Sequence, residues 1–457
     1  MTQPSSARRR VKSIEVGVKG YKSIRDEIAL TLKPLTVISG TNSSGKSSFM
    51  QTLLLLKQTL EAQFDPGALL LNGPNVGLTS SDQLFSRGKS KLDVAKAFFI
   101  SMNFGGTTIR LSFTKSHGSP ISLHSMEFER RGKRYLVREG PTDIPLQEVL
   151  DSDRQASLLS QYSKHEDFEF SVRARRNRCF LNLDIVASGG SGTRANFNLQ
   201  ASNQFFNALP FRSRLLEMIH VPGLRGNPER VYPRSAIGGL FPGTFEQYVA
   251  SAIHAWQASK SSADQSRIYQ LNRHLEELGL TWKVHAKPAN DTSVELLVGR
   301  MQHAQQGGAH DLVSIADVGF GVSQTLPVLV ALVAARPGQI VYLEQPEIHL
   351  HPKAQTTLAA ILAEHAARGV IVVSETHSSL IIRGIQTAIA TQLIDHREVQ
   401  LNWFTRTPDT GITQVSSVSP DELGRFGDWP SDFDDVAMEA DMAYLNAVEE
   451  REVVDEL

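Results

Sequence analysis

The chain has 457 residues, of which 41% are hydrophobic and 21% are charged, a composition that predicts one large or two ordinary globular domains with a sizeable core. The longest apolar run, Leu326 to Ala335, ends at Arg336 and is too short to cross a bilayer, so we expect no membrane partner. Cys179 is the single cysteine, which excludes an internal disulfide and a multi-cysteine zinc site. The basic N-terminal segment lacks a following apolar stretch, so we expect no secretory signal and a cytoplasmic location.

Charge is unevenly distributed, although the formal net charge is only -1. From Asp421 onward, thirteen acids face two bases, which gives this tail a charge of -11 and leaves +10 for the rest of the chain. A basic body attracts nucleic acid, but scattered surface lysine and arginine give the same composition. Composition alone does not separate the two interpretations.

The N-terminal part predicts strands, a glycine-rich turn and a helix. Residues 13–32 alternate apolar and polar residues as a pair of strands does, and residues 35–40 form an apolar strand that runs into glycine. We expect an apolar helix over 47–64 and a loop rich in Gly, Pro and Asn over 66–77.

The next segment has β patterns. Two strands flank Gly105-Gly106, a strong hairpin pattern, and further hairpins are expected around Gly132 and within 168–186. A short helix is expected over 146–162, and a flexible surface loop over 188–192.

Helical patterns dominate 204–280, although the Pro-, Gly- and Arg-rich segment 221–235 interrupts them. A strand pair is expected over 282–298. Three α/β units then close the chain: a glycine loop with a helix over 319–335, a strand with a helix over 339–369, and the strand 370–373. No internal repeat or long heptad run is present, so we expect no long coiled-coil arm.

Residues 40–47, Gly-Thr-Asn-Ser-Ser-Gly-Lys-Ser, match the P-loop pattern G-x-x-x-x-G-K-[ST] in full. Glycines let backbone N–H groups curl around phosphate oxygens, and the following helix directs its positive N-terminus at them. We expect Lys46 to neutralise the β- and γ-phosphates of ATP and Ser47 to ligate Mg²⁺. The residues expected to bind nucleotide here are Gly40, Thr41, Asn42, Ser43, Ser44, Gly45, Lys46, Ser47 and Ser48.

Three further motifs fit such a site. The strand 339–343 runs into Glu344, a position from which a carboxylate can hold the water shell of Mg²⁺. Gly319, Gly321 and Ser323 begin an apolar helix and make an anion site, unless Ser323 only caps that helix. His377 follows another apolar strand and could hydrogen-bond a γ-phosphate, although a lone histidine is more often structural.

In this order, the motifs at 19–24, 40–47, 319–324, 343–352 and 375–378 resemble the RecF/OLD-like branch of ABC ATPases. The segments 221–232 and 425–435 resemble stand-alone bacterial members of that branch that carry a C-terminal domain of unknown function. The resemblance implies an α/β fold, in which an ABC-type P-loop NTPase core is split between the chain ends and carries an antiparallel β lobe and a helical insertion. The expected parts are 1–110 for the N-terminal half of the core with the P-loop, 111–205 for the β-rich lobe, 206–300 for the helical insertion, 301–415 for the C-terminal half, and 416–457 for an acidic C-terminal cap.

The resemblance also assigns roles by position. Glu344 takes the Walker B role, in which it holds Mg²⁺ together with Ser47, and His377 takes the switch-histidine role. Gly319, Gly321 and Ser323 occupy the signature motif, which would touch the γ-phosphate of ATP held by another subunit. Residues 349–351 take the D-loop position, and Gln83 is a weaker candidate for the Q-loop.

Two residues depart from the pattern of the family. The signature serine usually precedes the glycine pair, whereas Ser323 follows it. The catalytic glutamate usually follows the Walker B acid, and here that residue is Gln345. An amide can orient the attacking water but cannot accept its proton at neutral pH, so we expect slow hydrolysis, with Glu344 or Glu347 partly substituting as base.

Other chemistries were weighed for several of these residues. His349, His351, Glu347 and His377 are compatible with zinc, but the D-loop interpretation explains them better. Asp432, Asp434 and Asp435 fit a solvated acidic tail better than a nuclease site, and the roughly eighty residues after His377 are too few for the metal-dependent domain of OLD-type nucleases. The arginines of the strand within 168–186 either meet a phosphate backbone or form a solvated hairpin face: Arg173, Arg175, Arg176 and Arg178.

The sequence therefore predicts an ATPase in which ATP and Mg²⁺ are closed between two copies of the chain, as a dimer or a higher oligomer, and released by hydrolysis. Three functions stay open: a sensor that controls a separate effector protein in bacterial anti-phage defence, a RecF-like repair clamp that binds DNA itself, and an ATP-binding scaffold that does not hydrolyse.

Overall fold

A computed structural model of the chain describes residues 13–90, 92–116, 118–130, 132–145, 168–189, 199–200, 208–301, 311–427 and 442. The helix expected over 146–162, most of the acidic cap and the aspartates Asp432, Asp434 and Asp435 lie outside the described residues.

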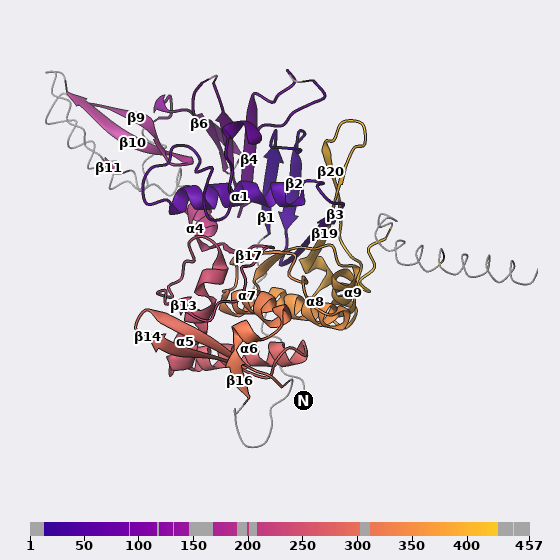
Figure 1. Ribbon diagram of the computed structural model, residues 1–457. Helices are drawn as coiled ribbons and strands as arrows, with labels where there is room; N and C mark the ends of the chain where they lie inside the picture. Colours follow the sequence, from indigo (N-terminus) through magenta and orange to yellow (C-terminus); the bar gives the residue numbers. More distant parts are fainter. Residues whose placement is uncertain are drawn as a thin grey trace, which may run out of the picture.

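A six-stranded sheet joins the two ends of the chain (Figure 1). Its first five strands are parallel, and the last is antiparallel to its neighbour. A strand from the N-terminal part, β3, lies between two strands from the C-terminal part, so neither end completes the sheet alone. In spatial order the strands are β12 (Ile219–Val221), β17 (Ile340–Glu344), β18 (Ile371–Glu375), β3 (Leu35–Gly40), β19 (Val399–Arg406) and β20 (Thr413–Val418).

The central strands are apolar on both faces because helices cover both sides of the sheet. Successive side chains of a strand point to opposite faces, and the hydrophobic core is divided accordingly. Ile38 and Tyr342 belong to the core that contains α1 (Lys46–Glu61), whereas Val37 and Leu343 belong to the core on the other face. That second core contains α7 (Phe320–Ala334), α8 (Pro352–Ala367) and α9 (Ser379–Ala390).

An antiparallel six-stranded sheet covers the other side of α1, so the four leucines at 53–56 are almost completely buried. The hairpin expected around Gly105-Gly106 is present, and both glycines have the positive φ that a tight two-residue turn requires, 62° and 82°. The strands of this sheet are β2 (Ile28–Leu32), β1 (Ile14–Lys19), β4 (Ala97–Phe104), β5 (Thr107–Thr114), β6 (Ser122–Arg130) and β7 (Lys133–Val137).

A smaller antiparallel sheet projects from the body near the C-terminal end of α1 (Figure 1). It is built on the hairpin of β9 and β10, and α4 (Leu209–Glu217) leads from it back to the central sheet. Its strands are β8 (Gly140–Pro141), β9 (Phe168–Asn177), β10 (Phe180–Gly189) and β11 (Leu199–Gln200).

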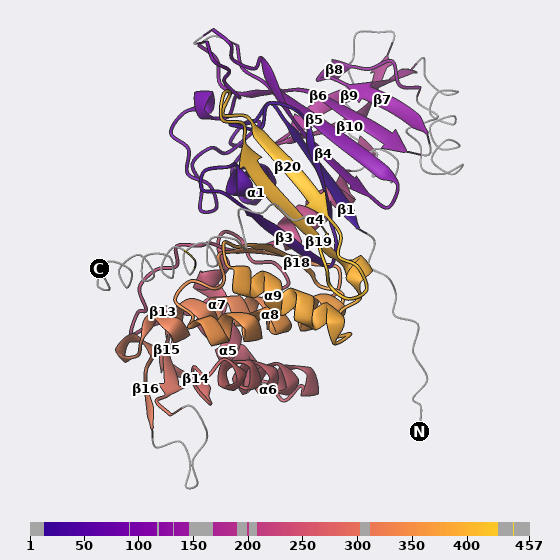
Figure 2. The ribbon, with the colours of Figure 1, turned by 90° about the vertical axis from the view of Figure 1, so that its right-hand side faces the viewer.

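A third layer packs against α7 and α8 on the side away from the central sheet (Figure 2). It contains α5 (Val249–Ala258), α6 (Ser262–Glu277) and a small sheet of β13 (Tyr232–Pro233), β14 (Val284–Asn290), β15 (Ser293–Gly299) and β16 (Leu312–Ser314). Short 3-10 turns connect the elements: η1 (Ser81–Gln83), η2 (Phe245–Tyr248), η3 (Ile315–Asp317) and η4 (His396–Glu398).

The split α/β core with antiparallel sheets and a mainly helical insertion is confirmed. Two expected boundaries differ from the observed elements. The boundary at 110/111 falls inside β5, whose sheet also contains β1 and β2 from the N-terminal part. The segment 206–300 contributes β12 to the central sheet. β12 has three residues, too few for a periodic pattern to distinguish it from a loop. Within the described part of the chain, each helix is too short or too polar to span a bilayer.

Candidate functional site

The carboxyl ends of the parallel strands share one edge of the sheet, and the P-loop, the segment from Glu344 to Glu347 and His377 follow these ends. The P-loop follows β3 and has the backbone conformation that its glycines permit. Gly40 and Gly45 have φ values of 140° and 104°. A Cβ at Gly40 would lie 2.0 Å from the carbonyl oxygen of Phe404, and one at Gly45 would lie 2.5 Å from Oγ1 of Thr413. Glycine is therefore required at both positions.

The P-loop side chains are arranged around the start of α1. Thr41, Asn42 and Ser43 are exposed, whereas Ser44 and Lys46 are buried. The Lys46 ammonium donates to the carbonyls of Gly40 at 3.0 Å and Thr41 at 2.7 Å, which orients it along the loop. Burial lowers the pKa of Lys46, and the nearby carboxylate of Glu375 opposes that shift.

Ser47 contacts a carboxylate that the sequence motifs did not single out. Its hydroxyl donates to Oε1 of Glu375 at 2.8 Å, and the Tyr342 hydroxyl donates to the other oxygen at 2.9 Å. Burial raises the pKa of Glu375, although both hydrogen bonds oppose the shift. An alcohol and a carboxylate are oxygen ligands of the type that Mg²⁺ prefers, so this pair fits that ion.

Glu344 lies beside Glu375 on the neighbouring strand, in direct register. Its carboxylate contacts Nε2 of His220 at 3.1 Å and accepts the Gly223 N–H at 3.1 Å. Burial by itself raises the pKa of Glu344, but the hydrogen bonds and charge of His220 and the Gly223 N–H outweigh it, and the net shift is downward. The magnesium role of Glu344 stays a prediction, because the carboxylate that contacts Ser47 is Glu375.

The two candidate catalytic residues after Glu344 have different surroundings. Gln345 is partly exposed and has a φ of 43°, in the left-handed region that disfavours side chains. Glu347 is buried; one oxygen accepts from Thr376 Oγ1 at 2.6 Å and from the His377 N–H at 3.1 Å. Burial raises the pKa of Glu347. This geometry makes Glu347 a support for the loop after β18, whereas Gln345 keeps an accessible side chain.

His377 is exposed just after the end of β18, and the charge of Lys46 acts on its ring. Burial of part of the ring lowers the pKa of His377, and the Lys46 charge lowers it further. A neutral imidazole beside the P-loop lysine can donate a hydrogen bond to phosphate or to water.

The glycine motif forms the N-terminus of α7 and lies against the loop that follows Gln345. Gly319 is the N-cap residue, and Phe320 is 52% exposed with its ring centroid 5.8 Å from that of His349. A Cβ on Gly321 would lie 3.5 Å from the His349 carbonyl. The Ser323 hydroxyl donates back to the Phe320 carbonyl at 3.2 Å and does not accept an N-cap hydrogen bond. The structure therefore brings together the segments assigned to the signature and the D-loop.

A zinc site was the alternative interpretation of the histidines after β17 and β18. No group of three or more His, Cys, Asp or Glu residues suited to a metal ion occurs among the described residues. Gln83 lies in η1, where its side chain hydrogen-bonds Thr79.

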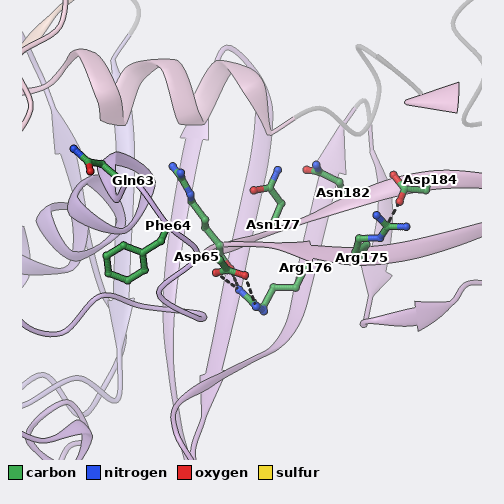
Figure 3. A pocket seen from close by; sticks show the side chains of 9 residues that line it. Gln63, Phe64, Asp65, Arg175, Arg176, Asn177, Asn182 and Asp184 are labelled. Atoms are coloured by element: carbon green, nitrogen blue, oxygen red, sulfur yellow. Dashed lines mark hydrogen bonds and ion pairs between the residues drawn. The ribbon is translucent and has the colours of Figure 1, made fainter. Parts of the chain in front are cut away.

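Arg176 and Arg178 attach the β9–β10 hairpin to the end of α1, and Figure 3 shows the contact of Arg176 with Asp65. Arg176 makes two hydrogen bonds to Asp65, at 2.9 and 2.8 Å, and Arg175 pairs with Asp184 at 3.3 Å. Arg178 donates to the carbonyls of Leu60 and Ala62 at the C-terminus of α1, where carbonyls lack partners within the helix. Arg175, Arg176 and Arg178 border a hollow of about 450 Å³, and each of the three has a partner within the chain.

Sequence reasoning missed Glu375, His220 and Arg225. Glu375 is the first residue of the motif 375–378. Its place at the end of an apolar strand was the feature of the sequence that could have indicated a site residue. His220 lies in β12 and Arg225 follows it, within the Pro-, Gly- and Arg-rich segment 221–235. Their roles depend on contacts with β17, which is more than a hundred residues away in sequence.

Two family models match the sequence. One, described as an AAA ATPase domain, matches residues 12–180, and the other, described as an AAA domain, putative AbiEii toxin, Type IV TA system, matches residues 220–383. The two matches contain the P-loop and the Glu344 segment respectively. No relative among curated proteins matches the sequence.

Solved structures of Smc head domains are similar to this chain. The Smc head bound to the C-winged helix domain of ScpA has 11% identity and a TM-score of 0.46, over 89% of this chain and 98% of that chain. The head domain from Thermotoga maritima has 10% identity and a TM-score of 0.40, over 89% and 99%. The head domain with an extended coiled coil bound to the C-terminal domain of ScpA, derived from Pyrococcus furiosus, has 10% identity and a TM-score of 0.43, over 96% and 99%. At these identities and TM-scores, the solved structures carry no further argument about this chain.

Proposed function

We propose that this chain, which the two family models support as an ABC-type AAA ATPase, belongs to the RecF/OLD-like branch and acts as a switch in which two copies close over Mg-ATP. The observation that carries this proposal is the presence of two half-sites on one chain. The P-loop forms one half, with Lys46 and Ser47 at the start of α1. The exposed N-terminus of α7, with Gly319 and Phe320, forms the other and is accessible to a second copy.

The nucleotide side of the site is formed by the P-loop and its neighbours. The loop N–H groups and the start of α1 would hold the phosphates, and Lys46 would turn from the loop carbonyls to the β- and γ-phosphates. A hollow of about 500 Å³ beside the P-loop would take the nucleoside; its lining includes Lys22, Ser23 and Phe85. Ser23 borders the P-loop, because Thr413 hydrogen-bonds both Ser23 and the Ser44 carbonyl.

Ser47 and Glu375 would hold Mg²⁺, with Glu344 beside them reaching its water shell. The ion would supply neutralisation of the charge that develops on the phosphates. Gln345 would orient the attacking water through its amide, and His377 would hydrogen-bond the γ-phosphate. Because no group at the Gln345 position accepts a proton, hydrolysis would be slow, as suits a switch that holds ATP until a partner acts.

Sedimentation with and without a non-hydrolysable ATP analogue tests the switch. We expect the analogue to increase the sedimentation coefficient of the wild type, while the Lys46→Ala variant stays unchanged. Equal sedimentation of the wild type with and without the analogue would contradict nucleotide-dependent closure.

The output of the switch is proposed to be a separate effector protein in anti-phage defence. Support comes from the toxin-system description of one matching family model. The second candidate, a repair clamp that binds DNA directly, draws support from the basic body of the chain. Two assays separate these candidates. Salt-dependent binding of a DNA duplex by the isolated protein favours the clamp. ATP-dependent co-purification of a nuclease encoded by an adjacent gene favours the sensor. A scaffold that binds without hydrolysing would release no phosphate in either setting.

A further inference from the structure

A buried arginine connects the α7 helix to the Gln345 segment. Arg225 lies on the loop after β12 and is 8% exposed. Its guanidinium donates to the carbonyls of Gln324 at 3.1 Å, Glu344 at 2.9 Å and Gln345 at 3.4 Å. The rigid fork of a guanidinium can bridge carbonyls on two segments at once, which an ammonium cannot do with the same geometry.

The connection is reciprocal. Gln324, in the second turn of α7, is 4% exposed, and its amide donates to the carbonyls of Gly226 at 3.1 Å and Arg225 at 3.4 Å. Each of the two side chains thus binds the backbone of the other's segment. We name this arrangement the Arg225–Gln324 clamp.

At one end, the clamp holds Gln324, the residue that directly follows the glycine-containing first turn of α7. Pro327 lies inside α7 and has no N–H, so the Ser323 carbonyl lacks the usual helical hydrogen bond. The turn from Phe320 to Ser323 is therefore less firmly attached to the rest of the helix than an ordinary first turn. A cavity of about 330 Å³ lies beside it and is lined in part by Arg225, Ser323 and Pro327.

At the other end, the clamp holds a residue with an unfavourable backbone. Gln345 has a φ of 43°, and such a conformation persists in a non-glycine residue only where the surroundings impose it. Its N–H donates to the Glu375 carbonyl at 2.8 Å, and its carbonyl accepts from Arg225. Arg225 thus holds the backbone that carries the proposed water-orienting amide, through the Glu344 and Gln345 carbonyls.

Burial makes this cation costly, and the carboxylates around it compensate. Burial lowers the pKa of Arg225 to about 10, opposed by the charges of Glu347, Glu246 and Glu344, so the guanidinium stays protonated at neutral pH. Apolar residues would fill the same volume without this desolvation cost. The geometry of the clamp gives the arginine a role that packing does not.

We propose that Arg225 is a positioning residue that couples the N-terminus of α7 to Gln345, so that engagement of α7 by nucleotide held on a second copy sets the orientation of the water-orienting amide. This inference rests on the proposed function, and it adds the path by which contact between copies would reach the hydrolytic residue.

The test compares Arg225→Lys, Gln324→Met and the double variant with the wild type. Arg230→Met is the matched control, because Arg230 lies on the same loop and forms an exposed pair with Asp317 just before α7. ADP affinity measures the P-loop alone, and steady-state phosphate release gives kcat and KM. We expect each single variant to keep ADP affinity within about twofold and to lose roughly ten- to a hundredfold in kcat, the scale at which a small misplacement acts. The double variant should be no worse than the poorer single variant, because both break one clamp.

Several outcomes would overturn the coupling: an unchanged kcat, a parallel loss of ADP affinity and kcat, or single-variant effects that multiply in the double variant. Amide hydrogen exchange provides a readout that needs no turnover. Gln324→Met should speed exchange of the backbone over 345–350 in the nucleotide-free protein, and unchanged exchange there rejects the clamp. If the wild type neither associates with the ATP analogue nor releases phosphate, the proposed function fails, and the exchange experiment still decides whether the two segments are linked.

Discussion

The hydroxyl of Ser47 donates a hydrogen bond of 2.8 Å to Glu375, and this contact joins the first turn of α1 to the end of β18. Glu375 is held on its other oxygen by Tyr342 and lies in register with Glu344. Two carboxylates and an alcohol therefore meet where three neighbouring strands end.

Glu375→Gln should raise the Mg²⁺ concentration needed for half-maximal phosphate release by roughly ten- to a hundredfold, because an amide oxygen carries no charge to hold the ion or its water shell. A titration of Mg²⁺ at saturating ATP measures this. Glu422→Gln, at an exposed position, serves as the control. An unchanged Mg²⁺ requirement in Glu375→Gln would assign the ion to Glu344 instead.

Lys46→Ala should weaken Mg-ATP binding by roughly ten- to a hundredfold, the value of a charge-assisted hydrogen bond to phosphate. The fold should persist, because the Lys46 ammonium donates its hydrogen bonds to the Gly40 and Thr41 carbonyls. Both carbonyls can bind water once the ammonium is removed. Calorimetric titration with Mg-ATP, together with thermal unfolding, checks both parts. Equal affinity in the variant and the wild type would refute the P-loop role.

Gly319→Glu should abolish association driven by the non-hydrolysable ATP analogue, because it adds a negative charge where a phosphate would approach. A Cβ at Gly319 meets nothing within 4 Å, so the exposed backbone at this position has space for a side chain. Gly321→Glu is a less clean test, since its Cβ would lie 3.4 Å from Leu280. Gly319→Ala is the uncharged control in sedimentation, and association that survives in Gly319→Glu would contradict the sandwich of two copies.

Gln345→Glu should raise kcat by about tenfold or more, a barrier change of roughly 1.4 kcal/mol, because it restores a proton acceptor beside the attacking water. Glu347→Gln should change kcat less, since Glu347 is buried and hydrogen-bonded to Thr376 and the His377 N–H. Steady-state phosphate release by the three proteins decides it. A fast wild type with a slower Gln345→Glu variant would place the chemistry on Glu344 or Glu347.

A buried histidine pair should make the stability depend on pH. Nε2 of His365 on α8 lies 3.3 Å from Nε2 of His274 on α6, and Arg368 contacts the other nitrogen of His365. Burial lowers the pKa of both rings, and the Arg368 charge lowers that of His365 further. The folded protein thus binds protons less readily than the unfolded chain, whose histidines titrate near 6.5.

The contribution of this pair is present above about pH 6.5 and is lost as the pH falls below it, by up to about 1.4 kcal/mol per pH unit for each ring. Urea unfolding between pH 8 and pH 5.5 measures the slope. His365→Leu should reduce the slope, while replacement of the exposed His351 by Gln should leave it unchanged. A wild-type stability that does not fall over this range would show that the pair does not titrate as its burial requires.

The sequence by itself determined the parts of this protein that depend on local pattern. The glycines and the lysine of residues 40–47 predict a phosphate-binding loop, because glycine lets the backbone N–H groups curl around an anion and the lysine neutralises its charge. Alternation and long apolar runs likewise predicted the hairpins and the central strands, whereas the split of the core was implied by the family resemblance. The family resemblance added roles for Glu344, Gln345 and His377, which stay predictions.

Tertiary structure alone decided which side chains meet at the ends of the strands. Glu375 contacts Ser47 because β18 pairs with β3 across more than three hundred residues of sequence, and no local pattern encodes that register. β12 was too short to recognise, so the contacts of His220 and Arg225 with β17 could not be anticipated. Periodicity reports the face on which a side chain lies, whereas the partner of a buried polar group depends on which strands become neighbours when the sheet is assembled.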